Sequence, residues 1–210
     1  MESNNTSLLL VFTRNATLGK VKTRLAASIG DADALSVHKA LMQQTIENVI
    51  QCACDKVVYY SEDIDAHDLF SKNGFRQEVQ SGTDLGSRMK NAFTAEFSHF
   101  YTSIVIIGTD CPDIDETCIS HAFKQLEDND FVLGPALDGG YYLLGLSAMH
   151  AELFEGIAWS TSSVLSDTIN IAQRLSLSIA FTSEKCDIDT FEDLKSSDFG
   201  RIHFPYLLDQ

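Results

Sequence analysis

Short apolar runs alternate with longer segments of helical spacing along most of the chain, and this alternation constrains the fold more than any other feature. Several runs are apolar throughout, which is typical of strands in a sheet that is covered on both faces. The predicted strands are residues 8–13, 56–61, 75–80, 103–108 and 131–136. The predicted helices, which start with acidic residues, are residues 31–51, 84–100 and 115–128. We therefore expect an α/β fold with three layers, a mostly parallel sheet and right-handed crossovers.

The pattern changes after Pro135, where Gly139 and Gly140 precede the strand-like sequence YYLLGL. A pair of glycines favours a turn, so we expect an irregular or antiparallel excursion here. The expected order then continues with a helix at 162–174, a strand at 177–182 and a helix from about Thr190. The 210 residues contain no repeat or linker that would divide them, and we expect one domain over residues 1–210.

The chain is strongly acidic, with a formal net charge of −15 and a pI near 4.6. Nucleic-acid backbones and anionic membrane surfaces attract excess positive charge, so we expect no affinity for either, although a small anionic ligand still fits where cations are concentrated. The acidic, polar start and the short apolar run at 8–12 do not fit a signal peptide. No run approaches the ~20 apolar residues of a membrane span. We expect a cytoplasmic protein, whose oligomeric state the sequence does not indicate.

The five cysteines form no CxxC pair, and their odd number fits reduced thiols better than a disulfide framework or a zinc site. Cys52 and Cys54 are expected to serve as small buried apolar side chains. No histidine lies near Cys111 in the sequence, so we do not expect a nucleophilic thiol there.

Positive charge is concentrated in the segment after the first predicted strand. Ligands bind beyond the carboxyl ends of the strands in open α/β sheets, and a cationic loop that leads into a helix is suited to phosphates. No acidic residue lies between Ser3 and Gly30, and the cations of this loop are Arg14, Lys20, Lys22 and Arg24. The spacing excludes a Walker A loop, and a GxGxxG motif is absent. The alternative is that these cations lie on a solvated loop.

A carboxylate ends the most apolar strand, in the sequence SIVIIGTDCPDID at 103–115. Mg²⁺ is commonly held by one or two carboxylates while phosphates and waters complete its shell, which makes Asp110 a candidate ligand. Pro112 disfavours helical geometry at the residue before it, so the chain should leave the sheet extended. Asp113 and Asp115 are expected at the N-terminus of the next helix. An ordinary turn carboxylate is the alternative for Asp110.

Two later segments follow strands as well. In the first, the glycines permit positive φ angles, while the aspartate and tyrosines offer hydrogen bonds and a stacking face; a simple turn explains the segment equally well. Its candidate residues are Asp138, Gly139, Gly140, Tyr141 and Tyr142. In the second, Asp187 and Asp189 alternate with apolar residues and should point to one side of an extended chain. A helix cap would explain Asp189 but not Asp187.

Together these segments resemble the GT-A-like nucleotide-diphospho-sugar transferase superfamily, and in particular its poorly characterised glycosyltransferase-like branch. The matching motifs are VKTRL at 21–25, DLGSRM at 84–89, GTDCP at 108–112, GPALDGGYYLLGL at 134–146 and DIDTFEDL at 187–194. The chain is similar, more distantly, to phospholactate and molybdenum cofactor guanylyltransferases. It lacks the LAGGxSxRMG loop of the better-known nucleotidyltransferases, and residues 15–18 replace the prolines expected in the first loop.

The resemblance implies a Rossmann-like GT-A fold with a mixed, mostly parallel sheet, and it implies roles for the residues above. Asp110, Asp187 and Asp189 should lie within reach of one Mg²⁺ or Mn²⁺ ion. The expected nucleotide- and phosphate-binding residues are Arg14, Lys20, Lys22, Arg24, Asp84 and Arg88. The acceptor or the sugar should lie near residues 138–142.

These expectations describe a metal-dependent transferase that takes a nucleotide or nucleotide-sugar and a small-molecule acceptor. Asp110 would act through the metal, while Lys22 and Arg24 would stabilise negative charge on the phosphates. Glycosyl transfer is the leading interpretation. A nucleotidyltransferase that releases pyrophosphate is the first alternative, and a non-catalytic module that senses a nucleotide-sugar is the second.

Overall fold

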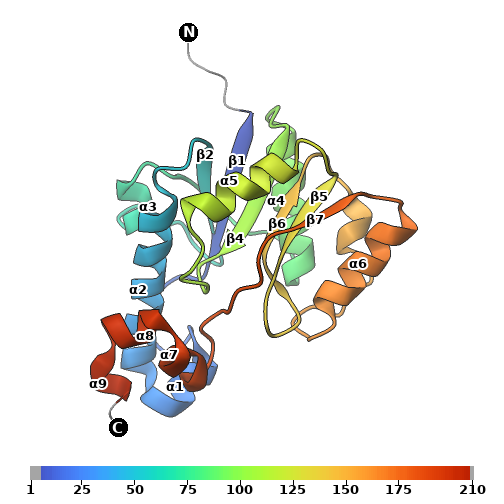
Figure 1. Cartoon of the computed structure of the whole chain (residues 1–210). Coiled ribbons are helices and arrows are strands. Elements are labelled where there is room, and N and C mark those ends of the chain that lie inside the picture. The colour runs from blue at the N-terminus through green and yellow to red at the C-terminus, as the bar shows by residue number, and fades with distance from the viewer. Residues whose placement is uncertain (1–5, 209–210) are drawn as a thin grey trace.

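A seven-stranded sheet forms the centre of the structure, which is a computed structural model that describes residues 6–208 (Figure 1). The strands are β1 Ser7–Thr13, β2 Asp55–Tyr60, β3 Arg76–Val79, β4 Ser103–Gly108, β5 Phe131–Pro135, β6 Tyr141–Leu146 and β7 Ile179–Phe181. Their order is β3-β2-β1-β4-β6-β5-β7. β6 is antiparallel to β4 and β5, whereas the other neighbouring pairs are parallel. The mixed, mostly parallel α/β sheet predicted from the sequence is thereby confirmed, as is the antiparallel excursion after β5.

Helices connect the strands, and several begin at the caps expected from the sequence. The helices are α1 Thr23–Ile29, α2 Asp31–Val49, α3 Leu69–Lys72, α4 Leu85–Phe97, α5 Glu116–Gln125, the 3₁₀ helix η1 Ala151–Phe154, α6 Val164–Arg174, α7 Phe191–Ser196, α8 Asp198–His203 and α9 Pro205–Leu208. Asp115 caps α5 by accepting a hydrogen bond from the N–H of Cys118. Asp113 does not cap this helix; its backbone carbonyl instead accepts from Lys185.

Both faces of the sheet are covered, because the strands are apolar on both sides. Leu9 and Val11 of β1 belong to a buried cluster that includes side chains of α2 and α5. Leu8 and Leu10, which point the other way, belong to a second cluster with side chains of α4 and α6. In Figure 1, α5 lies in front of the sheet and α4 behind it. The continuous apolar runs of the sequence therefore correspond to a doubly covered sheet.

A third buried cluster joins the two ends of the described chain. It lies between α1, α2 and the C-terminal helices α7, α8 and α9, which Figure 1 shows side by side. Its fully buried members include Leu25 of α1, Leu41 of α2 and Leu194 of α7. Ile188, which precedes α7, belongs to the same cluster. The segment that carries Asp187 and Asp189 is thus packed against the helix that follows the cationic loop.

Some expectations fall outside what the structure describes. Residues 1–5 of the polar N-terminal segment are not among the described residues, and the expectation of no signal peptide stays a prediction. Among the helices of residues 6–208, none is long and apolar enough to cross a membrane.

Candidate functional site

A cleft of about 680 Å³ lies beyond the carboxyl ends of β1 and β4. Its walls come from the loop after β1, the N-terminal end of α4 and the segment before α7. The lining includes the predicted residues Arg14, Lys20, Lys22, Arg24, Asp84, Arg88, Asp110 and Asp189. Segments that lie far apart in the sequence therefore meet in one cavity, because the carboxyl ends of parallel strands share one edge of the sheet.

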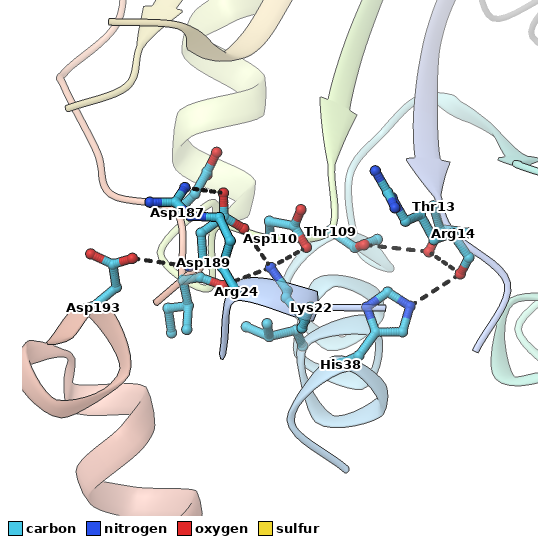
Figure 2. Close-up of polar contacts among 12 residues, drawn as sticks. Thr13, Arg14, Lys22, Arg24, His38, Thr109, Asp110, Asp187, Asp189 and Asp193 are labelled. Atoms are coloured by element: carbon cyan, nitrogen blue, oxygen red, sulfur yellow. Dashed lines mark hydrogen bonds and ion pairs between the residues drawn. The ribbon is translucent and has the colours of Figure 1, made fainter. Parts of the chain in front are cut away.

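Lys22 lies at the centre of this constellation, with a side chain that is only 4% exposed. Its Nζ donates to Oδ1 of Asp110 at 2.6 Å, to Oδ1 of Asp189 at 3.2 Å and to the carbonyl of Ile188 at 2.6 Å (Figure 2). Its backbone is left-handed, with φ 47° and ψ 44°, at the residue before α1. Burial lowers the pKa of Lys22, but attraction to Asp110 and Asp189 outweighs that effect and raises it overall.

Asp110 follows β4 and faces the cleft, where its side chain is 44% exposed. Its backbone carbonyl accepts from the N–H of Ile188, which ties the end of β4 to the segment before α7. Burial raises the pKa of Asp110, whereas the ammonium of Lys22 lowers it, and the net shift is downward. The carboxylate is therefore held ionised at the floor of the cleft.

Asp187 behaves in the opposite way. Burial, followed by repulsion from Asp110 and Asp189, raises its pKa to about 7. The side chain lines a smaller hollow of about 130 Å³, which also contacts Asp110, Tyr141 and Tyr142. With a pKa of about 7, Asp187 is only partly ionised near neutral pH, and it lies in the hollow beside the main cleft.

Asp189 links the carboxylates to the exposed side of the cleft. Its Oδ2 lies 3.8 Å from the guanidinium of Arg24, whose side chain is 70% exposed. Its backbone N–H donates to Asp193, which forms a capping box with Thr190 at the start of α7. Asp189 itself is therefore not the cap, and its carboxylate is free to face Lys22.

The other predicted cations lie along the cleft wall in different environments. Lys20 forms an exposed ion pair with Glu62 at 3.3 Å. Arg88 donates to the carbonyl of Gly82 and to Gln80. Asp84 is the N-cap of α4, and hydrogen bonding from Ser87 lowers its pKa. The structural role of Asp84 is therefore to cap α4. Its position in the cleft does not by itself show that it binds a ligand.

The segment at 138–142 has two parts: a turn, and two tyrosines that line the smaller hollow. Asp138 accepts from the N–H of Gly140, and a Cβ on Gly139, at φ +89°, would lie 2.2 Å from the carbonyl oxygen of Ser162. The hydroxyl of Tyr142 is bound to Thr182 and to the carbonyl of Ser183. The turn interpretation therefore explains residues 138–140, while Tyr141 and Tyr142 line the hollow beside Asp187.

Sequence reasoning missed His38, which lies on the buried face of α2 and lines the cleft. It is 2% exposed, and its Nε2 lies 3.1 Å from the carbonyl oxygen of Arg14. Burial lowers its pKa, so the neutral ring is favoured. The local sequence around a buried histidine in a helix does not indicate that it lines a site. The only available signal was that the helix with His38 follows closely after the cationic loop.

The three predicted metal ligands do not meet on one point as expected. Within residues 6–208 no group of three or more His, Cys, Asp or Glu side chains is arranged to hold a metal ion. Asp110 and Asp189 converge instead on the ammonium of Lys22. Two carboxylates that converge on a cation are nevertheless a donor set that suits a hard divalent ion, which commonly takes one or two carboxylates. The residue types fit such an ion, and Lys22 lies where it would have to bind.

Known structures share this fold. A candidate nucleotide-diphospho-sugar transferase from Desulfovibrio desulfuricans G20 superposes with a TM-score of 0.86 at 30% identity, over 98% of this chain and 94% of that protein. A cytidylyltransferase from Leptospira borgpetersenii serovar Hardjo-bovis gives 0.59 at 16% identity, over 91% and 84%. Rv0371c from Mycobacterium tuberculosis H37Rv, in complex with manganese, gives 0.55 at 12%, over 97% and 98%. These define the class as Rossmann-like α/β folds of the nucleotidyltransferase type.

The family follows from the sequence comparison. Residues 45–161 match the family described as uncharacterized protein conserved in bacteria (DUF2064), and the chain belongs to it. No curated protein matches this sequence.

Proposed function

We propose that the chain is a metal-dependent transferase that binds a nucleotide-sugar in the main cleft and moves its sugar to a small acceptor, with residues 1–210 acting as one domain. The observation that carries the proposal is the opposition of charges across one cleft. Cations of the loop after β1 and of α4 face the carboxylates of Asp110 and Asp189. A diphosphate needs the cations, and a divalent ion needs the carboxylates.

The cations supply the phosphate site. Arg14, Lys20, Arg24 and Arg88 all line the cleft, and Arg24 is largely exposed to it. Each of the three guanidinium groups can donate two hydrogen bonds to phosphate oxygens, and the Lys20 ammonium adds a point charge. These side chains would therefore hold the diphosphate and stabilise the charge that develops on it as the sugar is transferred. His38 supports this wall by fixing the carbonyl of Arg14.

Asp110 and Asp189, which face one point, are the residues that would hold Mg²⁺ or Mn²⁺, and Asp187 in the adjoining hollow is the third candidate ligand. When bound, such an ion neutralises charge on the leaving phosphate. Rv0371c, which has the same fold, is a manganese complex, which makes Mn²⁺ a sensible first probe. The smaller hollow beside Asp187, lined by Tyr141 and Tyr142, is our proposed place for the acceptor or sugar.

A second candidate is nucleotidyl transfer, and the number of cations favours it. The cleft wall carries Arg14, Lys20, Arg24 and Arg88 in addition to Lys22. Glu62, Asp84, Asp110 and Asp189 line the same cleft, so it is the number of cationic groups, and not the net charge, that would suit a triphosphate. The fold is shared with cytidylyltransferases, which is compatible with either chemistry.

Product analysis separates the candidates. The full chain is incubated with radiolabelled nucleotides and nucleotide-sugars, with and without Mn²⁺, after a thermal-shift screen has selected those that bind. Release of nucleoside diphosphate supports glycosyl transfer, whereas pyrophosphate supports nucleotidyl transfer. Binding without turnover across acceptors would contradict both and support the sensing module.

The matched variants are Asp110→Asn and Asp113→Asn, since Asp113 is an exposed carboxylate outside the cleft. Loss of Asp110 removes a proposed metal ligand, so we expect metal-dependent turnover to fall by about 100-fold or more. Asp113→Asn should retain it. Equal activity of the Asp110→Asn variant in metal-containing buffer would refute the metal-dependent proposal.

A further inference from the structure

The ammonium of Lys22 has no hydrogen-bond donor to spare. A lysine ammonium has three N–H groups, and Nζ has three acceptors within 3.2 Å: Asp110, Asp189 and the carbonyl of Ile188. The side chain is also nearly sealed from solvent. In this arrangement Lys22 cannot bind a phosphate oxygen, although it lines the cleft where phosphates are proposed to bind. A phosphate role for Lys22 therefore requires that something release it.

We propose that Lys22 is an exchangeable cation: a divalent ion that enters between Asp110 and Asp189 takes its place and frees its ammonium to bind the ligand phosphates. This inference rests on the proposed function and adds to it an order of events. The cleft would bind phosphates fully only after the metal has bound. Lys22 thus serves as the internal counter-ion of the metal-free protein and as a phosphate ligand of the loaded one.

The charge balance favours the exchange. Asp110 and Asp189 carry two negative charges and lie beside Asp187, whereas the buried ammonium supplies only one positive charge to these carboxylates. A divalent ion supplies two, from a point that two of these carboxylates already face (Figure 2). The freed ammonium then adds its charge to the phosphate side of the cleft, where Arg14 and Arg24 lie.

The backbone of Lys22 is strained and depends on its surroundings. Lys22 has the left-handed conformation, which costs a non-glycine residue roughly 1 kcal/mol or more and persists only where its surroundings hold it. It is the N-cap residue of α1 but makes no side-chain cap. The contacts that hold the side chain inward are its polar ones to Asp110, Asp189 and Ile188, and the metal would compete directly for the two carboxylates.

Labelling of the unmodified protein tests the exchange without any variant. The chain is treated with an amine-acetylating reagent, and the modification of Lys22 is measured by mass spectrometry relative to Lys124, which is 69% exposed and does not line the cleft. We expect Lys22 to be protected without metal, to react at least fivefold faster when Mn²⁺ is saturating, and to be protected again when pyrophosphate is added with Mn²⁺. Lys22 that stays protected in the Mn²⁺-saturated protein overturns the exchange.

Calorimetric titration with Mn²⁺ alone gives the second readout. Lys22→Gln removes the competing cation, so we expect it to bind Mn²⁺ about tenfold more tightly than the unmodified chain, whereas Lys20→Gln should change affinity by less than about twofold. Unchanged or weaker binding by Lys22→Gln contradicts the inference. If neither protein binds Mn²⁺, the metal site of the proposed function is wrong as well; if both bind it while Lys22 stays protected, only the exchange fails.

Discussion

Asp187, in the smaller hollow beside the cleft, is in an environment that disfavours its ionised form. Its pKa rises from an ordinary 3.8 to about 7, first through burial and then through Asp110 and Asp189. This carboxyl group binds its proton more tightly in the folded state than in the unfolded state. The free energy of unfolding therefore falls as pH rises from about 4 to about 7, and it falls no further above that range. A bound divalent ion would offset this cost.

Asp187→Asn should therefore stabilise the metal-free chain at pH 8 but have little effect at pH 4. A shift of about three units corresponds to at most about 4 kcal/mol, and after solvent screening we expect the variant to gain about 2 kcal/mol in the free energy of unfolding at pH 8. Urea denaturation at the two pH values measures it. Asp113→Asn, which removes an exposed carboxylate, should show no such difference, and a pH-independent effect of Asp187→Asn would contradict the argument.

At the residue scale, the sequence was sufficient to select most of the charged side chains that line the cleft, but not His38 or Glu62, and not how the side chains pair. Lys22 and Asp110 could be selected because cations stood out in an acidic chain and because a carboxylate followed an apolar strand. The contact between them depends on a left-handed backbone at Lys22 and on Ile188 lying beside Asp110. Both are consequences of tertiary packing, for which a local pattern gives no signal.

At the scale of elements, strands were easier to predict than short helices. β4 has the predicted bounds, since the four aliphatic residues between Ser103 and Gly108 leave little choice. α1, α8 and α9 were not predicted, because helices of four to seven residues have too few turns for a periodic signal. They are stabilised by the buried cluster that joins α1, α2 and the C-terminal helices.

The start of α4 shows how one glycine positions an element. A Cβ on Gly86 would lie 2.1 Å from the indole of Trp159, so the helix can approach this ring only with glycine at that position. Gly86 belongs to the DLGSRM motif, and its neighbour Leu85 lines both the cleft and the smaller hollow. The glycine therefore sets the distance between the N-terminal end of α4 and the segment that carries Trp159.

We expect Gly86→Ala to destabilise the chain by about 1–3 kcal/mol, because the methyl group overpacks this contact. Trp159 is the single tryptophan, so its emission should shift to longer wavelength as the ring is displaced. Thr94→Ala, at an exposed position of α4, should leave the emission unchanged. In a Trp159→Ala background, Gly86→Ala should cost nothing or stabilise, since alanine favours helix; a cost that persists there would show that the contact is not the cause.

At the scale of the whole molecule, the site depends on how the two ends of the described chain pack together. Lys22 and Asp189 are 167 positions apart, yet their side chains meet. The segments that carry Lys22 and Asp189 are held together by the buried cluster of α1, α2, α7, α8 and α9. Phe199 is a member of this cluster. The protein as a whole is acidic, so the anion binding that we propose for this cleft would have to come from local placement of its cations.

Phe199→Leu tests this dependence of the site on the C-terminal helices. Loosening the cluster should cost about 1–2 kcal/mol of stability and should also separate the segments that build the cleft. Binding of Mn²⁺ with pyrophosphate, read as a ligand-induced rise in melting temperature, should therefore weaken; a tenfold loss of affinity removes about 1.4 kcal/mol of ligand stabilisation.

Phe70→Leu is the matched control, because Phe70 is fully buried in the cluster beneath α2 and α5 and does not line the cleft. It should lose comparable stability while keeping the full ligand-induced rise, since the packing of α7 and α8 on α1 is left intact. If both variants keep the ligand response, the C-terminal helices only stabilise the fold. If both variants lose the ligand response, ligand binding depends on the overall stability of the protein and not specifically on the packing of α7 to α9. Only a loss confined to Phe199→Leu shows that the C-terminal helices position Asp189 against Lys22.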